Sequence, residues 1–218
     1  MKLYLDTAGV DDIQTAAELG VVDGVTTNPS IIANSGLGYR EAVAGINDVI
    51  DGPIFAQVIA DNTNDMINEA HAYQDWADKI IIKIPASRAG FEALARLRAE
   101  DIPAGITVVF SVEQAVLAAK NDATFVAPYL GRLDDVGADG LATIKRMQRV
   151  FNAQEFDTEV LAASIRNTTQ ATALYEAGID AITMSPDLLE AHITHDMTDR
   201  GIVGFDSDWG DRGSPISD

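Results

Sequence analysis

The sequence has no cysteine and no long apolar run. Without cysteine, neither disulfide bonds nor thiolate metal sites can hold the fold of this 218-residue chain. No apolar segment approaches the length that a membrane-spanning helix requires. The amino-terminal segment reaches a carboxylate, Asp6, too early for the apolar core of a secretory signal peptide. These absences predict a cytoplasmic protein with no transmembrane segment.

Basic residues are also scarce, since the chain has 15 lysines and arginines against 34 acidic residues and a formal net charge of −19. This charge argues against nucleic acid and membrane partners, because phosphate backbones and anionic lipids would be repelled. Of the acidic residues 24 are aspartates, and of the basic residues only 5 are lysines. This excess of hydrated carboxylates favours a halophilic surface, screened at high salt, over an ordinary acidic cytosolic enzyme.

The chain alternates short apolar runs with longer amphipathic segments. With 47% hydrophobic residues it can bury one sizeable core, but it is too short for two full domains. Eight short runs rich in apolar or β-branched residues predict strands at 3–6, 24–28, 54–60, 80–85, 104–110, 125–130, 160–165 and 181–184. Apolar residues at the helical period predict helices at 11–19, 62–77, 91–99, 111–119, 139–151, 168–177 and 186–194. Ser111 and Glu113 give a capping signal whose spacing is one residue short of the capping box.

Eight strands alternating with helices predict an α/β protein made of parallel β-α units. A closed barrel and an open doubly wound sheet both fit this order. The chain lacks a Gly-x-Gly-x-x-Gly turn after its first strand and has no Gly-x-x-x-x-Gly-Lys-Ser/Thr loop. The count of eight strands and the chain length favour a single-domain (β/α)8 TIM barrel over residues 1–200.

Residues 201–218 form a predicted C-terminal tail that is rich in glycine and aspartate. Phe205 and Trp209 are its only large anchors, and they suit docking on a neighbouring subunit. Gly201, Gly204 and Gly210 argue against a long regular helix in this segment, because glycine lowers the stability of a helix.

Lys83 is the only charged residue in the apolar run 80–85, which is typical of a buried strand. A buried ammonium group is costly unless it is paired or neutralised. Burial lowers the pKa of a lysine, and a neutral amine can attack a carbonyl group to form a Schiff base. The alternative is a lysine at a strand end, with its stem buried and its amine in water.

Polar residues near the ends of other strands bear on this choice, because the catalytic groups of a TIM barrel lie at the carboxyl ends of its strands. Seven of the eight predicted strands carry polar residues near that end, namely Asp6, Thr27 with Asn28 and Ser30, Gln57, Lys83, Thr107, Tyr129 with Arg132, and Ser164 with Arg166. A single such residue is usually a hydrogen-bonded core group. Seven of them near the same end favour a catalytic site with Lys83 as the nucleophile.

The residue types fit one chemistry. A carboxylate such as Asp6 can hold the amine of Lys83 and exchange protons with a carbinolamine. The amide of Asn28 can bind substrate hydroxyl groups, and the phenol of Tyr129 can donate or accept a proton.

A basic group follows two of the late strands. Arg132 and Arg166, together with Ser164, can hold a phosphate, because guanidinium groups bind it through two hydrogen bonds. Each arginine alone is more typical of a solvated surface. Because basic residues are scarce and the late strands of this fold often build a phosphate site, the pair favours anion binding.

Six segments between residue 3 and about residue 187 carry a family resemblance: Leu5-Asp6-Thr7, Gly24-Val25-Thr26-Thr27-Asn28-Pro29-Ser30, Ile82-Lys83-Ile84-Pro85, Gly105-Ile106-Thr107, Ala127-Pro128-Tyr129 with Arg132, and Ala162-Ala163-Ser164-Ile165-Arg166. With these motifs the sequence resembles the transaldolase family in its short form, which includes fructose-6-phosphate aldolase. The resemblance implies a (β/α)8 barrel and a class I aldolase mechanism without a metal or another cofactor.

The resemblance also implies roles for the site residues. Lys83 would attack the C2 carbonyl of a ketose phosphate such as fructose 6-phosphate, and cleavage of the C3–C4 bond would leave a dihydroxyacetone enamine on it. Asp6 and Asn28 would orient the donor hydroxyl groups, with Thr27 and Ser30 beside them as substrate-binding residues.

The resemblance further implies that Thr107 positions the water used in proton transfer. It assigns Ser164, Arg132 and Arg166 to the acceptor phosphate. Relatives of the short form assemble as pentamers or decamers through C-terminal segments, so a homo-oligomer is expected.

Two positions distinguish the subtypes of the family. Transaldolases resemble one another in carrying a glutamate on the third strand and a phenylalanine on the sixth. At these two places this chain has Gln57 and Tyr129, as in the aldolase subtype. Glutamine cannot act as a base, so Tyr129 would protonate the enamine through water and release free dihydroxyacetone. Residues 107–111, 131–135 and Arg166 are more similar to transaldolases. We favour the aldolase; the alternative is a transaldolase of the pentose phosphate pathway.

Three other hypotheses remain open. The same chemistry can act on a sulfosugar, because an arginine-lined site also holds a sulfonate. A barrel that binds a sugar phosphate without catalysis would need a structural Lys83. A metal-dependent aldolase is disfavoured, because only His71, His192 and His195 are present and zinc normally needs a third protein ligand.

Overall fold

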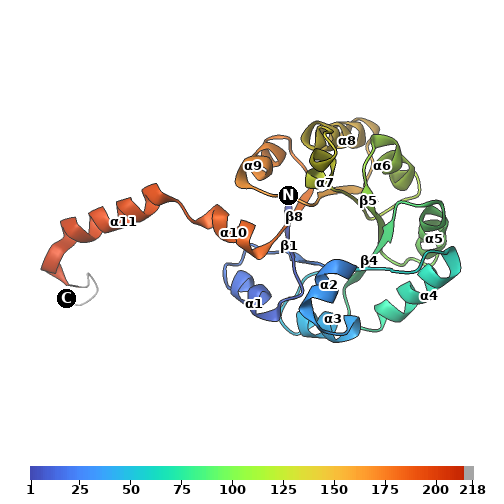
Figure 1. Ribbon diagram of the computed structural model, residues 1–218, viewed down its shortest axis with the longest axis horizontal. Helices are drawn as coiled ribbons and strands as arrows, with labels where there is room; N and C mark the ends of the chain where they lie inside the picture. Colours follow the sequence, from blue (N-terminus) through green and yellow to red (C-terminus); the bar gives the residue numbers. More distant parts are fainter. Residues whose placement is uncertain (214–218) are drawn as a thin grey trace.

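The protein folds as a closed eight-stranded parallel barrel surrounded by helices (Figure 1). The computed structural model describes residues 1–213. The strands follow one another around the barrel in sequence order, and β8 pairs with β1 to close it. Their bounds are β1 (Lys2–Asp6), β2 (Gly24–Thr26), β3 (Ile54–Gln57), β4 (Ile80–Pro85), β5 (Ala104–Val109), β6 (Phe125–Pro128), β7 (Glu159–Ala162) and β8 (Ala181–Met184). The predicted TIM barrel is therefore confirmed.

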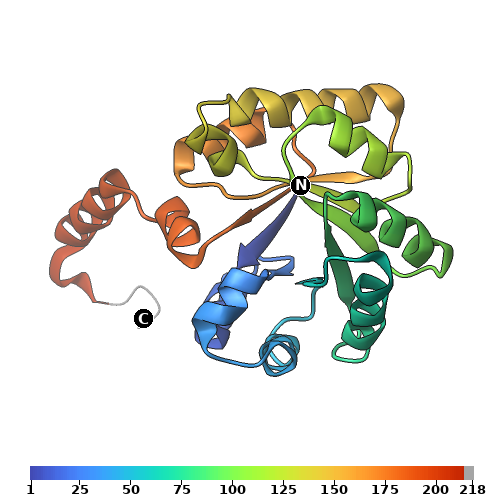
Figure 2. The ribbon, with the colours of Figure 1, turned by 45° about the vertical axis from the view of Figure 1, so that its right-hand side comes forward.

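The helices form the outer layer of the barrel (Figure 2). Those that the helical period predicted are α1 (Val10–Glu18), α4 (Thr63–Gln74), α5 (Arg88–Ala99), α6 (Val112–Ala119), α8 (Gly140–Gln154), α9 (Thr168–Glu176) and α10 (Pro186–Ile193). Those that it missed are α2 (Pro29–Ser35), α3 (Tyr39–Asn47), α7 (Leu130–Asp135) and α11 (Asp196–Trp209), which is followed by the 3₁₀ turn η1 (Gly210–Arg212). Among the described residues, no helix combines the length and apolar character that crossing a bilayer demands.

The capping signal at Ser111 is a complete capping box. Its hydroxyl accepts a hydrogen bond from the backbone amide of Gln114, and the Gln114 side chain accepts one from the backbone amide of Ser111. The partner is therefore Gln114 rather than Glu113, and the box has its normal spacing.

An aromatic layer fills the barrel interior toward the amino ends of the strands. Tyr4, Phe55 and Phe125 pack edge to face, with ring centroids 4.9 and 5.1 Å apart. Gly105 makes room for this layer, because a Cβ atom there would lie 2.4 Å from the ring of Phe125. Each buried ring stabilises the fold by roughly 1.5–3 kcal/mol. The next inward positions on β1 and β3 are Asp6 and Gln57, so the layer toward the carboxyl end is more polar.

Helix α11 corrects the expectation of an irregular tail. It begins at Asp196, before the predicted boundary at residue 200, and continues through Gly201 and Gly204 to Trp209. Figures 1 and 2 show it projecting away from the barrel. None of its residues is buried, so packing against the rest of the described chain does not account for this helix. Residues 214–218 of the predicted tail lie outside the described part.

Candidate active site

A small cavity of about 130 Å³ lies at the carboxyl end of the barrel, directly above the aromatic layer. Its lining comes from most of the strands and their following loops: Asp6, Thr26, Asn28, Lys83, Ala127, Tyr129, Arg132, Leu161, Ala163, Ser164 and Thr183. Six of the predicted site residues are in this set. Strand order and parallel direction bring them together from distant parts of the sequence.

Lys83 is the most deeply buried charged group of the cavity, with 4% of its surface exposed. Its Nζ atom donates a hydrogen bond of 2.7 Å to the backbone carbonyl oxygen of Thr27. Burial lowers the pKa of Lys83 from its ordinary value, and the negative charge of Asp6 opposes this effect. The amine does not reach bulk water, so the interpretation of a strand-end lysine with a solvated head is wrong. Burial instead favours the nucleophilic, neutral form.

Asp6 is held by a short chain of threonine hydroxyl groups. Thr26 Oγ1 donates to Asp6 Oδ1 at 2.6 Å, and it lies 2.7 Å from the hydroxyl oxygen of Thr183. Because the proton of Thr26 points to the carboxylate, Thr183 must donate to Thr26. The chain fixes the orientation of Asp6 beside Lys83. Thr183 is on β8, the one strand for which the sequence analysis named no polar site residue. Residues two apart on a strand face the same side, so the position of Thr183 two residues after Ala181 could have predicted that its side chain points into the barrel.

Gln57 lies next to Lys83 on the adjacent strand, since the two are register partners in β3 and β4. Only 9% of Gln57 is exposed, and its oxygen Oε1 is buried with no hydrogen-bond partner among the described residues. A buried carbonyl oxygen without a partner is costly, so it is suited to hold a water molecule or a substrate hydroxyl group.

Tyr129 and Thr107 form a hydroxyl pair on the opposite side of Lys83, with their oxygens 3.2 Å apart. Burial raises the pKa of Tyr129, while the hydrogen bond with Thr107 opposes the shift. The phenol is therefore protonated at neutral pH. Between Thr107 and Val109 the register of β5 and β6 shifts, and Val108 adopts a left-handed φ of 58°. Such a conformation is a genuine outlier for a β-branched residue and marks strain at the site.

The motif around Asn28 both caps a helix and faces the site. Asn28 Oδ1 accepts hydrogen bonds from the backbone amides of Ser30 and Ile31 at 3.0 Å, which begins α2. In the described part of the chain, no hydrogen bond uses the Asn28 amide nitrogen, so this donor can meet a substrate. Ser30 is exposed at the edge of a neighbouring cavity. Thr27 instead points its hydroxyl into the barrel wall and offers the site its carbonyl oxygen.

The two predicted arginines have different surroundings. Arg132 lines the cavity and makes no ion pair with any described residue. Arg166 is bound to the Asp135 carboxylate by two parallel hydrogen bonds of 2.6 Å, which raise the pKa of Arg166 and lower that of Asp135. Its guanidinium packs on Gly131, where a Cβ atom would lie 2.6 Å from Nε. Of the two, only Arg132 is free to meet an anion, next to Ser164.

Comparison with known proteins identifies the family of this chain. A family model described as Transaldolase/Fructose-6-phosphate aldolase matches residues 3–211. The chain belongs to the transaldolase and fructose-6-phosphate aldolase family. A "Probable transaldolase" of Methanococcus maripaludis is 43% identical over 209 residues, 96% of this chain and 97% of the relative. A "Probable transaldolase 2" of Listeria monocytogenes is 41% identical over 209 residues, 96% of each chain. The protein is thus an enzyme of the aldolase or transaldolase type.

Solved structures of other families share only the barrel. A mutant mandelate oxidase superimposes with a TM-score of 0.59 at 14% identity, over 84% of this chain and 63% of that one. A mutant flavocytochrome b2 gives a TM-score of 0.61 at 10% identity, over 85% of this chain and 56% of that one. The chain therefore spans about six tenths of these larger structures. At this identity the likeness concerns the fold alone.

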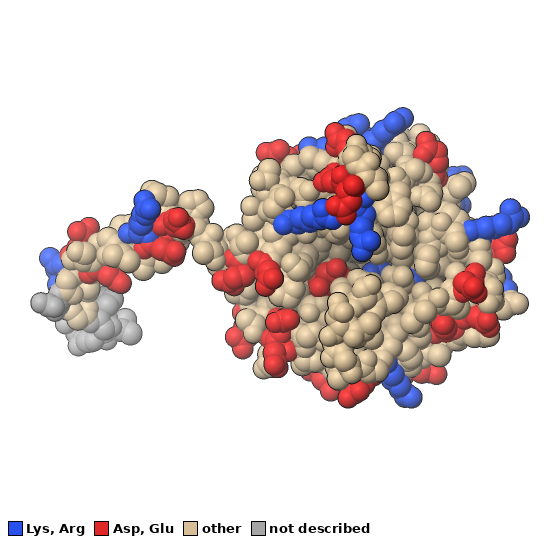
Figure 3. All heavy atoms as spheres, in the orientation of Figure 1, with Lys and Arg blue, Asp and Glu red and all other residues tan. Residues whose placement is uncertain are grey.

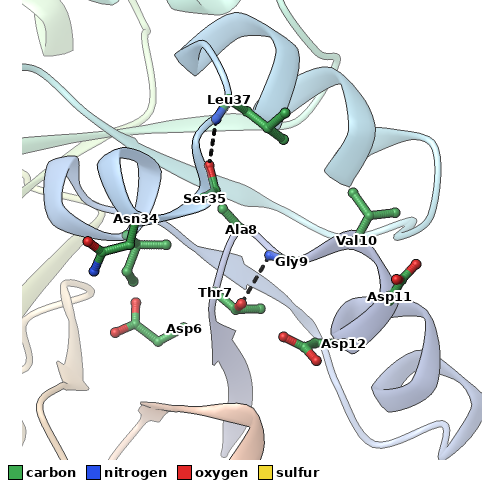
Figure 4. A pocket seen from close by; sticks show the side chains of 11 residues that line it. Asp6, Thr7, Ala8, Gly9, Val10, Asp11, Asp12, Asn34, Ser35 and Leu37 are labelled. Carbon is green, nitrogen blue, oxygen red and sulfur yellow. Dashed lines mark hydrogen bonds between the residues drawn. The ribbon is translucent and has the colours of Figure 1, made fainter.

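Two larger cavities adjoin the site of this transaldolase-family enzyme. One of about 400 Å³ continues outward past Asn28, Val108 and Arg132. The other, of about 600 Å³, lies between the loop after β1 and helix α2 (Figure 4). Asp6 lines all three cavities. Figure 3 shows basic and acidic side chains side by side at the edge of the central hollow. The site therefore has room for a substrate longer than three carbons.

The histidines are engaged in protein contacts. His192 Nδ1 lies 2.6 Å from the carbonyl oxygen of Leu188, and Nε2 lies 3.1 Å from the hydroxyl of Tyr175. His195 accepts a hydrogen bond from the backbone amide of Met197. In the part of the chain that the structure describes, no three His, Asp or Glu side chains are grouped as metal ligands would be.

Proposed function

We propose that Lys83 forms a Schiff base with the carbonyl carbon of a ketose phosphate and that the enzyme cleaves or forms the C3–C4 bond. The observation that carries this proposal is the burial of Lys83 in a polar cavity, with the pKa of its amine lowered beside the Asp6 carboxylate. A neutral amine is the reactive form, and burial favours this form over the ammonium ion. A purely structural lysine would have no reason to line a cavity with seven other polar residues.

The steps balance with the residues present. The neutral amine adds to the C2 carbonyl, and Asp6 exchanges the protons that let the carbinolamine lose water to an iminium ion. A base takes the proton of the C4 hydroxyl, the C3–C4 bond breaks, and its electron pair moves to the iminium nitrogen. The products are an aldehyde and a three-carbon enamine on Lys83. The amide nitrogen of Asn28 is suited to orient the donor hydroxyl groups during these steps.

The fate of the enamine decides between lyase and transferase. We favour the aldolase, because the protonated Tyr129 phenol is paired with Thr107 and the unpartnered Gln57 oxygen can hold a water near Lys83. A water bridging these groups can deliver a proton to the enamine carbon, after which hydrolysis releases dihydroxyacetone. Fructose 6-phosphate is the expected substrate.

A transaldolase is the second candidate. The curated relatives at 41–43% identity carry the name probable transaldolase, and the Arg132 side of the cavity resembles that subtype. In that reaction the enamine attacks a second aldehyde phosphate before any proton reaches it.

One assay separates the two activities. Fructose 6-phosphate is supplied with and without erythrose 4-phosphate, and free dihydroxyacetone is measured. Release without the acceptor supports the aldolase, whereas strict dependence on the acceptor contradicts it. Borohydride trapping with dihydroxyacetone tests the shared step, because a stable adduct on Lys83 requires an imine. A barrel that only binds sugar phosphates would give no adduct.

The anion that Arg132 and Ser164 accept is proposed to be a phosphate. A sulfonate has similar oxygens and would bind the same guanidinium. Phosphate and sulfonate analogues of one sugar, compared as competitive inhibitors, distinguish these substrates.

Helix α11 is proposed to dock on a second copy of the chain in a homo-oligomer, for which a pentamer or decamer is expected. It exposes Met197, Ile202, Val203, Phe205 and Trp209, and Phe205 is 75% exposed. A projecting helix with so many exposed apolar side chains needs a partner to be stable.

The acidic surface is proposed to be a salt adaptation of a cytoplasmic enzyme. With a formal net charge of −19, repulsion between carboxylates opposes folding at low ionic strength. We therefore expect the free energy of unfolding to rise between low salt and molar potassium chloride. An enzyme that unfolds at the same urea concentration in both would contradict this.

A further inference from the structure

Tyr39 touches the backbone of the barrel wall directly behind Lys83. It is the first residue of α3, and its hydroxyl accepts a hydrogen bond of 2.5 Å from the backbone amide of Gln57. The same hydroxyl lies 3.2 Å from Thr27 Oγ1. Because the hydroxyl proton of Thr27 goes to the carbonyl of Phe55 at 2.9 Å, Tyr39 is the donor to Thr27. The amide proton of Gln57 and the hydroxyl protons of Tyr39 and Thr27 therefore each have one defined acceptor.

This contact replaces a bond of the ladder between β2 and β3. The amide of Thr27 donates to the carbonyl of Phe55 at 3.0 Å, as a regular parallel ladder requires. In that register the next bond would run from the amide of Gln57 to the carbonyl of Thr27. Instead, the Gln57 amide turns to Tyr39, and the Thr27 carbonyl accepts from Lys83 at 2.7 Å. The Gln57 amide and the Thr27 carbonyl thus bind Tyr39 and Lys83 in place of each other, at the point where the amine of Lys83 is held.

The ring of Tyr39 is held in place by other aromatic residues. Its centroid lies 5.2 Å from that of Tyr73 and 5.5 Å from that of Trp76. Burial raises the pKa of Tyr39, so the hydroxyl keeps its proton and can accept and donate at once. The hydroxyl is thus a fixed and fully used group on the outer side of the barrel wall, and Tyr39 lines none of the three cavities of the site.

We propose that Tyr39 is a positioning residue whose hydroxyl draws the Gln57 amide away from the Thr27 carbonyl and so reserves that carbonyl for the amine of Lys83. The consequence for catalysis rests on the proposed imine chemistry, but the structural link does not. Without the hydroxyl, the Gln57 amide regains the ladder bond, and Lys83 must share or lose its acceptor. The Gln57 side chain moves with its backbone.

The test compares Tyr39→Phe with Tyr73→Phe as a matched control. Tyr73→Phe removes a hydroxyl from the neighbouring ring, near Glu69, without touching Thr27 or Gln57. Lys83 is labelled competitively with acetic anhydride over a pH series, and its peptide is quantified by mass spectrometry. A carbonyl acceptor stabilises the ammonium form, so its loss lowers the pKa of the amine. We expect the labelling midpoint of Tyr39→Phe to fall by about half a pH unit and that of Tyr73→Phe to stay.

Steady-state kinetics gives the second readout. We expect Tyr39→Phe to lower kcat about 10-fold with KM changed less than about 2-fold, because the displaced groups act on the reacting atoms. A wild-type midpoint in Tyr39→Phe overturns the proposal, and so does an equal shift in Tyr73→Phe, which would indicate a general loss of packing. The labelling needs no substrate. A wild-type enzyme that gives no borohydride-stable adduct would therefore overturn the proposed function alone and leave the labelling result decisive for Tyr39.

Discussion

The hydroxyl oxygens of Tyr129 and Thr107 lie 3.2 Å apart across the ends of β6 and β5. In the aldolase reaction proposed above, this pair would transfer the proton to the enamine. Tyr129→Phe removes the acidic hydroxyl and leaves the ring, so release of dihydroxyacetone should fall about 100-fold, within the usual range for a lost general acid. Transfer to an added aldehyde needs no proton at the enamine and should fall much less.

Tyr4→Phe is the control for this variant, because Tyr4 also lies inside the barrel but belongs to the aromatic layer below the site. Both reactions of Tyr4→Phe should stay near those of the unsubstituted enzyme. An equal loss of release and transfer in Tyr129→Phe would show that Tyr129 acts on a step common to both.

Replacing Lys83 by methionine should abolish the reaction and leave the fold intact, since a similar apolar chain fills the space. In the folded protein the pKa of Lys83 lies below its ordinary value of 10.5, because burial disfavours the charge. Between these two values the unfolded chain binds more protons, so the free energy of unfolding rises with pH. Below the folded pKa the full penalty of burying the ammonium is present.

Lys83→Met lacks this penalty, so it should be more stable than the unsubstituted protein at neutral pH by roughly 1–3 kcal/mol. The difference should shrink as the pH approaches 10. Urea unfolding at several pH values measures it. A variant that is less stable at neutral pH, or a difference that does not change with pH, would show that Lys83 is a structural cation.

Arg132 and Arg166 should contribute unequally to phosphate binding. Arg132 is unpaired among the described residues, whereas Arg166 is engaged by Asp135. Arg132→Ala should raise the KM for a phosphorylated acceptor or substrate by about 10- to 100-fold, the value of a charge-assisted hydrogen bond, and Arg166→Ala by only a few-fold. Arg149→Ala, on the outer face of α8, controls for the change in net charge.

Asp135→Asn provides the reverse experiment, because it removes the negative charge that pairs with Arg166. If the ion pair withholds this arginine from the substrate, the KM for the phosphorylated substrate should fall. Equal effects of the two arginine substitutions would instead mean that the pair with Asp135 opens when substrate binds.

Helix α11 should determine the oligomeric state. Because Phe205 and Trp209 are exposed on the isolated chain, replacing both by serine should lower the mass of the assembly, as light scattering at about micromolar concentration would measure. Leu117→Ser, at an exposed apolar residue on α6, is the control. An unchanged mass in the double variant would contradict docking through α11.

Much of the site was predictable from the sequence because barrel geometry converts a linear pattern into a cluster. Lys83, Asp6 and Tyr129 lie near strand ends, and parallel strands place all such ends at one mouth. Tyr39 was not predictable, because it lies in a helix that the pattern missed and reaches the wall from outside. Helix α11 was missed because glycine content is a weak guide: Gly201 and Gly204 lie within this helix although none of its residues is buried.

Val108 provides the last test, since it holds a φ of 58° at the register shift beside Thr107. A left-handed conformation costs a residue with a Cβ atom roughly 1–2 kcal/mol, which glycine avoids. In Val108→Gly this relief should offset the lost side-chain contacts, so the free energy of unfolding should change by less than about 1 kcal/mol. Val109→Gly, one residue further and fully buried, should lose about 3 kcal/mol in the same urea titration. Equal losses in the two variants would mean that the bend at Val108 is unstrained and that side-chain burial alone stabilises this end of β5.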